Sequence, residues 1–113
     1  MMEHPSAHIV SANRVIATQF GLDIDTDDEA ALLHAGDIRA ALIARIAALL
    51  SRDAERLMHI LYRVDVEERK VQGIFRDIPP AEMAAALADL IIDRQLAKAS
   101  TRARYTDPDE QSD

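Results

Sequence analysis

Large apolar residues recur every three or four positions through most of this chain, which is the spacing of one face of an α-helix. Two such stripes follow one another with almost no break: Ile38, Leu42, Ile46 and Leu49, and then Leu57, Ile60, Leu61 and Val64. No Asn-Gly, Asp-Gly or Gly-Gly pair marks a hairpin turn. The pattern therefore predicts an all-α domain whose helices pack along their apolar faces.

The segment that begins at Pro80 predicts the longest helix, which at ~24 residues would extend ~36 Å. Two neighbouring apolar faces run along it: Met83, Leu87, Leu90 and Ile91 form one, and Ile92, Leu96 and Ala99 form the other. An apolar arc this wide indicates contact with two neighbours. We therefore expect the first of the two faces to contact a second copy of the chain in a homodimer.

The N-terminal part of the chain has a weaker pattern. Residues 1–10 show no apolar period, so we expect a flexible arm there. Residues 11–20 fit a short helix that buries Ile16 and Phe20, but their β-branched content also allows a strand. Gly21 is expected to end this element in either case.

The stretch DIDTDDEAALLH, which starts at Asp23, has acidic residues at alternate positions and so raises the question of a calcium loop. Such a loop needs Gly at its sixth position and Glu at its twelfth, where this chain has Asp28 and His34. The start of a helix fits better, with Thr26 or Asp27 as the N-cap and acidic residues in the first turn, where the helix dipole favours anions.

Two helix boundaries depend on single residues. At Gly36 the helix that starts near Asp27 either ends, with Asp37 capping the next helix, or continues at a cost of about 1 kcal/mol. Further on, Asp65 and Glu68 have the spacing of a capping box, so we expect Asp65 to cap a helix that ends before the Pro-Pro pair.

These elements predict a small bundle of four to five helices with the long C-terminal helix as its spine. Residues 11–106 would form this single domain, and residues 107–113 (DPDEQSD) a disordered acidic tail. Apolar residues make up 49% of the 113-residue chain, but many of them are Ala and none is Trp. Because such a core is thin for one small chain, we expect homodimerisation to complete the bundle.

Composition and charge exclude several classes of function. The chain has no Cys, which excludes disulfides, thiolate metal sites and cysteine nucleophiles. No signal peptide or membrane-spanning apolar run is visible, so a cytoplasmic location and no membrane partner are expected. The net charge is −7, divided as −6 over residues 1–37, +3 over residues 38–106 and −4 over residues 107–113. A net-acidic chain is a poor nonspecific binder of nucleic acid.

The most regular polar feature is a basic stripe spaced four, three and four residues apart: Arg52, Arg56, His59 and Arg63. On one helix these side chains would share a face, as a site for phosphate, nucleic acid or an acidic peptide. The alternative is a solvated face whose charges pair locally, since Asp53 and Glu55 are at suitable spacings.

A second basic stripe, Arg94, Lys98 and Arg102, lies near the end of the long helix. Cations there complement the negative end of the helix dipole, and the acidic tail has the charge to fold back on them. The alternative is a docking site for an acidic partner or nucleic acid.

Metal and cofactor chemistry have little support in the sequence. His4 and His8 are four residues apart, as are Glu55 and His59, but two ligands do not make a site. The Glu-x-x-His motif of di-iron bundles and any Gly-rich phosphate loop are absent from the sequence. We therefore expect neither a metal nor a cofactor.

Three functions remain as hypotheses. The first is a non-enzymatic interaction or regulatory module that docks a protein partner on a helical surface. The second is a nucleic-acid-associated helical protein that uses the two basic stripes. The third is a small enzyme with a site at a dimer interface, where His59 or Asp93 would act. Asp89 and Asp93 would serve as acid–base carboxylates only inside a cleft, and the alternative is that they form the solvent face of the last helix. The absence of a catalytic constellation in the sequence favours the first.

Overall fold

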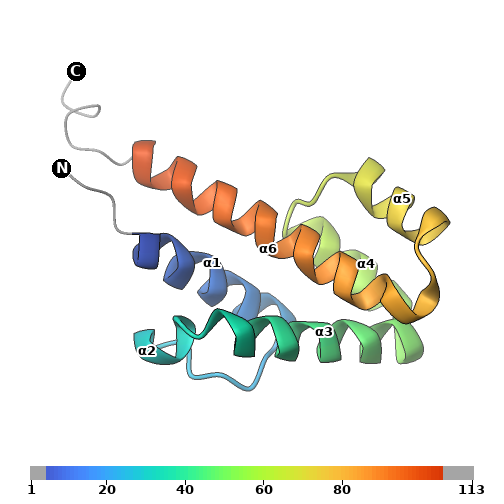
Figure 1. Ribbon diagram of the computed structural model, residues 1–113, viewed down its shortest axis with the longest axis horizontal. Coiled ribbons are helices and arrows are strands. Elements are labelled where there is room, and N and C mark those ends of the chain that lie inside the picture. The colour runs from blue at the N-terminus through green and yellow to red at the C-terminus, as the bar shows by residue number, and fades with distance from the viewer. Residues whose placement is uncertain (1–4, 106–113) are drawn as a thin grey trace.

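The computed structural model describes residues 5–105, and the described part of the chain consists of six helices and no strand. In chain order the helices are α1 (Pro5–Phe20), α2 (Glu29–Leu32), α3 (Ala35–Arg52), α4 (Ala54–Arg63), α5 (Glu68–Asp77) and α6 (Pro80–Tyr105), as Figure 1 shows. The all-α prediction is confirmed. The structure has one helix more than the four to five expected, because the single turn of α2 is separate from α3.

The long helix α6 is the spine of the fold (Figure 1). Helices α1 and α3 both pack along it and against each other, and α4 contacts α3 and α1. Helix α5 packs mainly against α6, at one end of the molecule. The wide apolar arc of α6 is thus in contact with several neighbours from its own chain.

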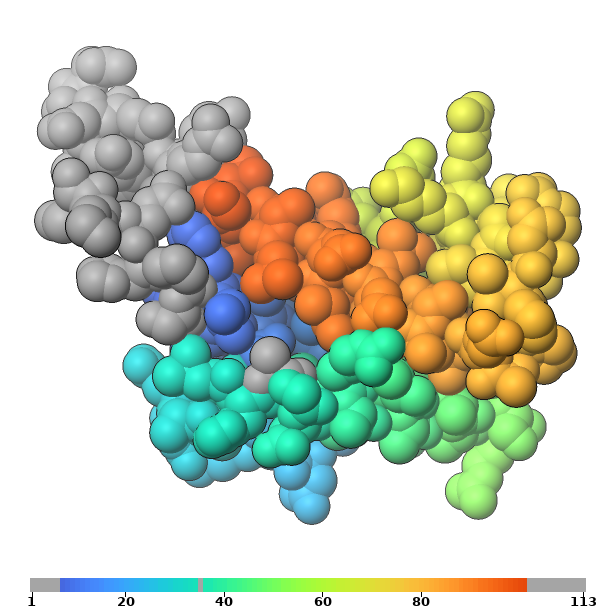
Figure 2. Space-filling model, viewed as in Figure 1, coloured from blue at the N-terminus to red at the C-terminus, as the bar shows by residue number. Residues whose placement is uncertain are grey.

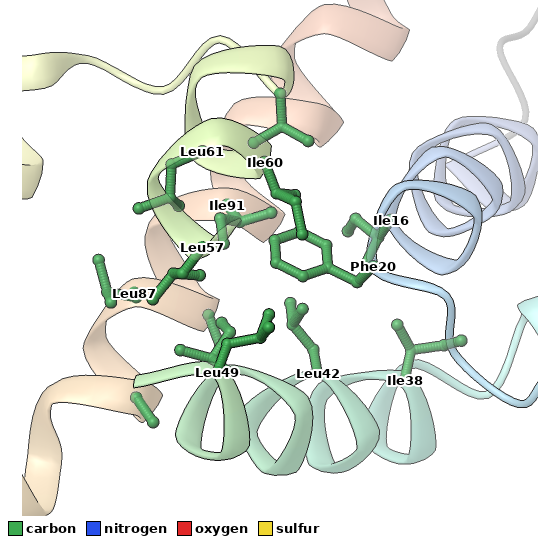
Figure 3. Close-up of a cluster of buried hydrophobic side chains, with 14 of the residues drawn as sticks. Ile16, Phe20, Ile38, Leu42, Leu49, Leu57, Ile60, Leu61, Leu87 and Ile91 are labelled. Atoms are coloured by element: carbon green, nitrogen blue, oxygen red, sulfur yellow. The ribbon is translucent and has the colours of Figure 1, made fainter. Parts of the chain in front are cut away.

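The core lies where α1, α3, α4 and α6 meet (Figure 3). Phe20, 1% exposed, reaches from the end of α1 into the space between α3 and α4. The two apolar stripes of α3 and α4 that the sequence predicted are all buried: Ile38, Leu42, Ile46, Leu49, Leu57, Ile60, Leu61 and Val64. The periodicity therefore identified the inner faces of both helices.

The apolar face of α6 that we expected at a dimer interface is largely used within the chain. Leu87 and Ile91 have no exposed surface, and both belong to the core. Met83 and Leu90 are partly buried and pack against that core. Within one chain, these residues already have the apolar environment that the dimer was expected to supply.

The N-terminal helix is longer than the sequence suggested. Residues 5–10, part of the expected flexible arm, form the first turns of α1, and Val10 is buried. The alternative of a strand over residues 11–20 is wrong. Gly21 ends α1 as expected: it adopts a φ of 63°, while the N–H groups of Leu22 and Gly21 bond to the carbonyls of Ala17 and Thr18. The acidic tail, residues 107–113, lies outside the described residues.

The acidic stretch after α1 starts a helix, as expected. The N-cap comes one residue after Asp27, the later of the two expected positions. The N-cap is Asp28, whose carboxylate accepts hydrogen bonds from the N–H groups of Ala30 and Ala31. The break before α3 falls at Leu33 and His34, and Gly36 lies inside the first turn of α3. A break that coincides with no glycine or proline has no local sequence signal.

Buried amide side chains join the helices at their ends. The Asn13 Nδ2 group of α1 donates to the carbonyl of Leu32, the last residue of α2, at 2.6 Å. Gln95 Nε2 of α6 donates to the carbonyl of Val64, just beyond α4, at 2.7 Å. The last carbonyls of a helix have no partner within it, so each amide satisfies a group that would otherwise be buried and unpaired.

Candidate functional site

The first basic stripe is divided between two helices. Helix α3 ends at Arg52, and Asp53 then adopts an extended φ of −155° and caps α4 by accepting a hydrogen bond from the Arg56 N–H group. The expectation that all four residues share one helical stripe is therefore wrong for Arg52. Arg56, His59 and Arg63 do share α4, and their side chains are exposed.

The three α4 side chains Arg56, His59 and Arg63 make no ion pair with any residue between 5 and 105. The local pairing that would have explained them, through Glu55 of the same helix, is not formed within that range. Arg52 is likewise exposed and without an ion pair to a described residue. None of these four cations is therefore neutralised by an acidic residue of the described part of the chain.

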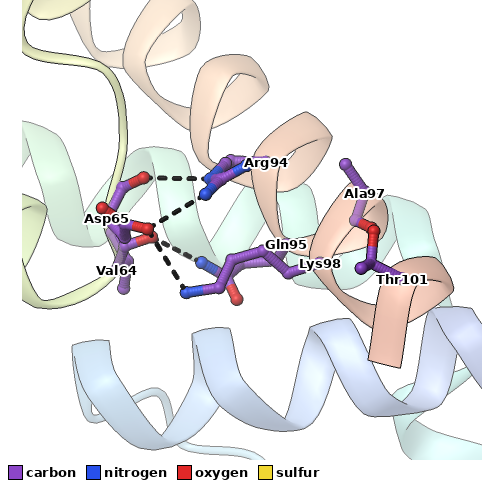
Figure 4. Close-up of polar contacts among 7 residues, drawn as sticks. All are labelled: Val64, Asp65, Arg94, Gln95, Ala97, Lys98 and Thr101. Atoms are coloured by element: carbon purple, nitrogen blue, oxygen red, sulfur yellow. Dashed lines mark hydrogen bonds and ion pairs between the residues drawn. The ribbon is translucent and has the colours of Figure 1, made fainter. Parts of the chain in front are cut away.

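The second stripe has a structural partner. Arg94 donates from Nη2 to the Asp65 carboxylate at 3.0 Å and from Nε to the Asp65 carbonyl at 3.0 Å (Figure 4). Lys98 Nζ lies 3.9 Å from the same carboxylate. The side chain of Arg102 is outside the described part of the structure. Arg94 and Lys98 thus hold the connection between α4 and α5 against α6.

Asp65 has a different role from the capping role that we expected. Helix α5 begins at Glu68, and its N-cap position is Glu67, with no side-chain hydrogen bond. Asp65 instead adopts a φ of 60°, a left-handed conformation that Asp tolerates better than most residues, and so turns the chain after α4. The hydrogen bond from Arg94, and the positive charges of Arg94 and Lys98, lower the pKa of the Asp65 carboxyl.

An apolar groove of about 510 Å³ lies between α4 and α5. Its lining consists of Met58, Leu61 and Tyr62 from α4, Asp65 and Val66 from the connection, and Glu68 and Val71 from α5. Leu61 and Val71 are buried, whereas Met58 is 45% and Tyr62 88% exposed. The groove is therefore open to solvent along α4.

Exposed large apolar side chains are concentrated around this groove. Four are found in the described part of the chain: Leu33, Met58, Tyr62 and Phe75. All but Leu33 belong to α4 and α5. Figure 2 shows α5 standing at one corner of the molecule, next to α6.

We call Arg56, Met58, His59, Tyr62 and Arg63 the α4 surface.

The sequence reasoning missed Met58 and Tyr62. The signal was present, since the two are four residues apart and lie outside the stripe formed by Leu57, Ile60, Leu61 and Val64. Large apolar residues on the polar side of an otherwise strongly amphipathic helix indicate a second contact surface.

A second cleft, of about 530 Å³, lies on the other side of the α4–α5 connection. Its charged lining residues are Asp65, Glu67, Lys70, Asp93 and Arg94. Two of its cations are already paired, Arg94 with Asp65 at 3.0 Å and Lys70 with Glu67 at 3.7 Å. Of the five, Asp93 makes no ion pair with a described residue, so the lining has three acidic and two basic groups.

The structure does not bring the candidate catalytic groups together. Asp93 lines the second cleft, whereas Asp89 forms a bidentate ion pair with Arg39 of α3, with distances of 2.8 and 3.1 Å. His59 lines neither the groove nor the second cleft. The hydrogen bond from Arg39 lowers the pKa of Asp89, so this carboxyl is suited to remain ionised rather than to act as an acid.

Among residues 5–105, no three His, Asp or Glu side chains are arranged to hold a metal ion. In the acidic stretch, Asp25 Oδ1 accepts a hydrogen bond from the Asp27 N–H group at 2.9 Å, and Asp28 caps α2. These carboxylates bond to nearby backbone groups. His4 lies outside the described residues.

None of the helices in the described region has both the length and the apolar character needed to cross a membrane. Comparison of the chain with models of known protein families, with curated proteins and with solved structures found no match.

Proposed function

We propose that this protein is a non-enzymatic interaction module that docks a protein partner on the α4 surface. One observation carries the proposal: Tyr62, 88% exposed, and Met58 share the exposed side of α4 with three basic side chains that make no ion pair with a described residue. Tyr, Met and Arg are the side chains enriched in protein interfaces.

The proposal is also supported by the difference between the two faces of α4. On the inner face, Leu57, Ile60 and Leu61 are buried in the core. The folding of the chain therefore does not explain the apolar residues of its outer face. Covering the exposed Tyr and Met with a partner would remove apolar surface from water, and Tyr and Arg are both enriched among the residues that dominate binding energy.

Nucleic acid is the second candidate, because an exposed Tyr beside three basic residues could stack on a base. The net charge of −7 opposes it through long-range repulsion of phosphates. It predicts binding that falls steeply with salt and is lost when Arg52 and Arg56 are changed to Ala. A low-salt mobility shift with single- and double-stranded nucleic acids tests this directly.

We retain homodimerisation through α6 as a separate prediction. Leu87 and Ile91 are inside the chain's own core, so a second copy would contact the partly buried Met83 and Leu90 of the expected dimer face. Size-exclusion chromatography with light scattering at micromolar concentration gives the oligomeric state. A stable monomer in this measurement would count against a dimer.

The docking proposal is tested by affinity purification from lysate of the native host, with nuclease treatment. We expect the wild-type chain to retain at least one protein that the double variant Met58→Ser/Tyr62→Ala does not retain. Leu33→Ser is the matched control, since Leu33 is 43% exposed but lies outside the groove, beyond α2. Circular dichroism must show the same helicity for all three proteins.

Two results would contradict the proposal. One is a set of captured proteins that is the same for the wild type and the Met58→Ser/Tyr62→Ala variant. The other is capture that disappears on nuclease treatment, which would favour the nucleic-acid alternative.

A further inference from the structure

We infer that α5 and the connection before it form a flap that opens from the molecule as one unit while α1, α3, α4 and α6 stay folded. Such a movement is independent of the docking proposal. Four properties of the described residues support it: the small apolar surface that α5 buries, the clefts on its two sides, the strained turn at Asp65 and the exposed ion pairs that hold this turn.

Helix α5 is fixed to the rest of the molecule by few apolar side chains. Of its ten residues only Val71 is buried, whereas α4, with the same length, has three buried residues. Gly73 in the middle of α5 also lowers its helix propensity. An isolated helix of fewer than about 12 residues is marginal in water, so α5 depends on this small contact to stay formed. Elements with few buried apolar contacts are those that open at the lowest free-energy cost.

Two clefts separate α5 and its connection from the neighbouring helices. The groove of about 510 Å³ lies on the α4 side, and the second cleft, of about 530 Å³, lies on the α6 side. Val66 lines both clefts, and the adjacent α5 residues Lys70 and Val71 line different ones. Helix α5 packs mainly against α6 and stands at one end of the molecule (Figure 1). The contact that keeps the flap closed is therefore a narrow strip between two open clefts.

The connection before α5 contains a strained turn. Among the described residues, Asp65 is the one residue other than glycine that has a positive φ, at 60°. This left-handed conformation is less favourable for an L-residue than the right-handed one, so the turn persists only while its surroundings hold it. At the other end of α5, Pro79 and Pro80 have a φ that is fixed by their rings. The turn at Asp65 is therefore the place where the chain rotates when the flap opens.

Exposed ion pairs hold this turn. Arg94 of α6 donates to the carboxylate and to the carbonyl of Asp65 at 3.0 Å, and Lys98 Nζ lies 3.9 Å from the carboxylate (Figure 4). The Asp65 side chain is 66% exposed and the Arg94 side chain 43%. Ion pairs this exposed are weak and are screened by salt, so they break without the unfolding of α6. We call Asp65, Arg94 and Lys98 the latch.

Opening of the flap changes the surface between α4 and α6. Leu61 lines the groove on one side of Val66, and Leu90 lines the second cleft on the other. When Val66 and Val71 move away with the flap, the two clefts become one, and Leu61, 2% exposed in the closed form, meets solvent. The groove also loses the side that α5 provides. The flap thus controls whether the groove is present, a consequence for docking that rests on the proposed function.

Native-state hydrogen exchange of the full chain, followed by mass spectrometry at neutral pH and low salt, tests the flap. We expect the helical amides of α5, residues 72–77, to have protection factors at least about tenfold lower than those of α4, residues 58–63. The amides of α4 exchange only when the whole chain unfolds, whereas those of α5 exchange each time the flap opens.

Asp65→Asn and Asp89→Asn are matched variants, because each removes one carboxylate that pairs with an Arg, and Asn tolerates the left-handed turn at position 65. Asp65→Asn should lower the protection of α5 by about threefold, since the latch is absent from the open form. The pair of Arg39 with Asp89 lies outside the flap and stays formed when it opens. Asp89→Asn should therefore lower the protection of α4 and change that of α5 less than about 1.5-fold.

Equal protection of α5 and α4 in the wild type would overturn the inference, because both would then exchange only through global unfolding. Equal effects of Asp65→Asn and Asp89→Asn on α5 would overturn it for the same reason. Protection of α5 that Asp65→Asn leaves unchanged would show that the latch does not hold the flap. If lysate capture fails while the exchange results are as expected, the flap stands and only the docking function is wrong.

Discussion

The side chain of Gln95 on α6 is buried in the apolar core of the molecule and is 1% exposed. Its amide group donates a hydrogen bond to the carbonyl of Val64 at 2.7 Å. We predict that Gln95→Met lowers the free energy of unfolding by about 1–3 kcal/mol, because the Val64 carbonyl is left buried without a donor. Urea unfolding followed by circular dichroism measures the change. Gln72→Met, at an exposed position of α5, is the control and should change stability by less than about 0.5 kcal/mol.

The functional residues could be predicted only in part from the sequence. The spacing of Arg56, His59 and Arg63 identified a basic side of α4, and the structure leaves it exposed. Arg94 and Lys98 have the same kind of spacing, but they have a structural role. Both pair with Asp65, which precedes Arg94 by 29 positions and Lys98 by 33. Spacing along a helix indicates on which face a side chain lies, but it does not identify a partner that is distant in the sequence.

At the scale of the helices, glycine has opposite effects at two positions. Gly73 lies in the middle of α5 with a negative φ, and a Cβ there would be 3.8 Å from the tip of the Arg76 side chain, an ordinary van der Waals contact. We predict that Gly73→Ala raises the free energy of unfolding by about 0.4–1 kcal/mol, through the lower entropy of the unfolded chain.

Gly21 provides the contrasting case, because it ends α1 with a φ of 63° and a side chain there would be strained whatever the space around it. Gly21→Ala should lower the stability by about 1–2 kcal/mol. Thermal and urea unfolding of both variants check the pair. A destabilised Gly73→Ala protein would mean that α5 is not the regular helix described above.

Most helices could be predicted from the apolar period, but their ends could not always be. The buried stripes of α3 and α4 repeat at helical spacing, and Gly21 and the Pro-Pro pair are strong local signals. The break at His34 lacks such a signal, whereas the separation of Arg52 from α4 has one, the N-cap residue Asp53. At His34 the helices α2 and α3 both contact α1, and α3 packs in addition on α6, which is tertiary information.

At the scale of the whole molecule, homodimerisation stays a prediction. The apolar arc of α6 is wide because α1, α3 and α5 all pack on it, so its width has an explanation within one chain. Among the described residues, α4 carries two of the large exposed apolar side chains, Met58 and Tyr62, which interrupt a polar face. A sequence pattern shows that a face is buried, but it does not distinguish a neighbour in the same chain from one in a second copy.

Ion pairs of two carboxylates, Asp65 and Asp89, attach α6 to the rest of the molecule and make its stability depend on pH. Arg94 and Lys98 bind Asp65 after α4, and Arg39 of α3 binds Asp89. Both Asp residues have a pKa below the ordinary value, in each case mainly through the hydrogen bond from Arg. A lowered pKa in the folded state means that the folded chain binds protons less readily than the unfolded chain does.

The stabilisation from these carboxylates should therefore be fully present above about pH 5 and be lost as the pH falls below about 4 through their folded pKa values. We predict that Asp65→Asn/Asp89→Asn lowers the melting temperature by a few degrees at pH 7 and that this difference from the wild type disappears toward pH 2. Melting curves from pH 2 to pH 8 measure it, with Asp23→Asn as an exposed control that makes no ion pair with described residues. A difference that stays constant down to pH 2 would show that the substitutions act through backbone or packing changes, because a protonated carboxyl no longer forms the ion pair.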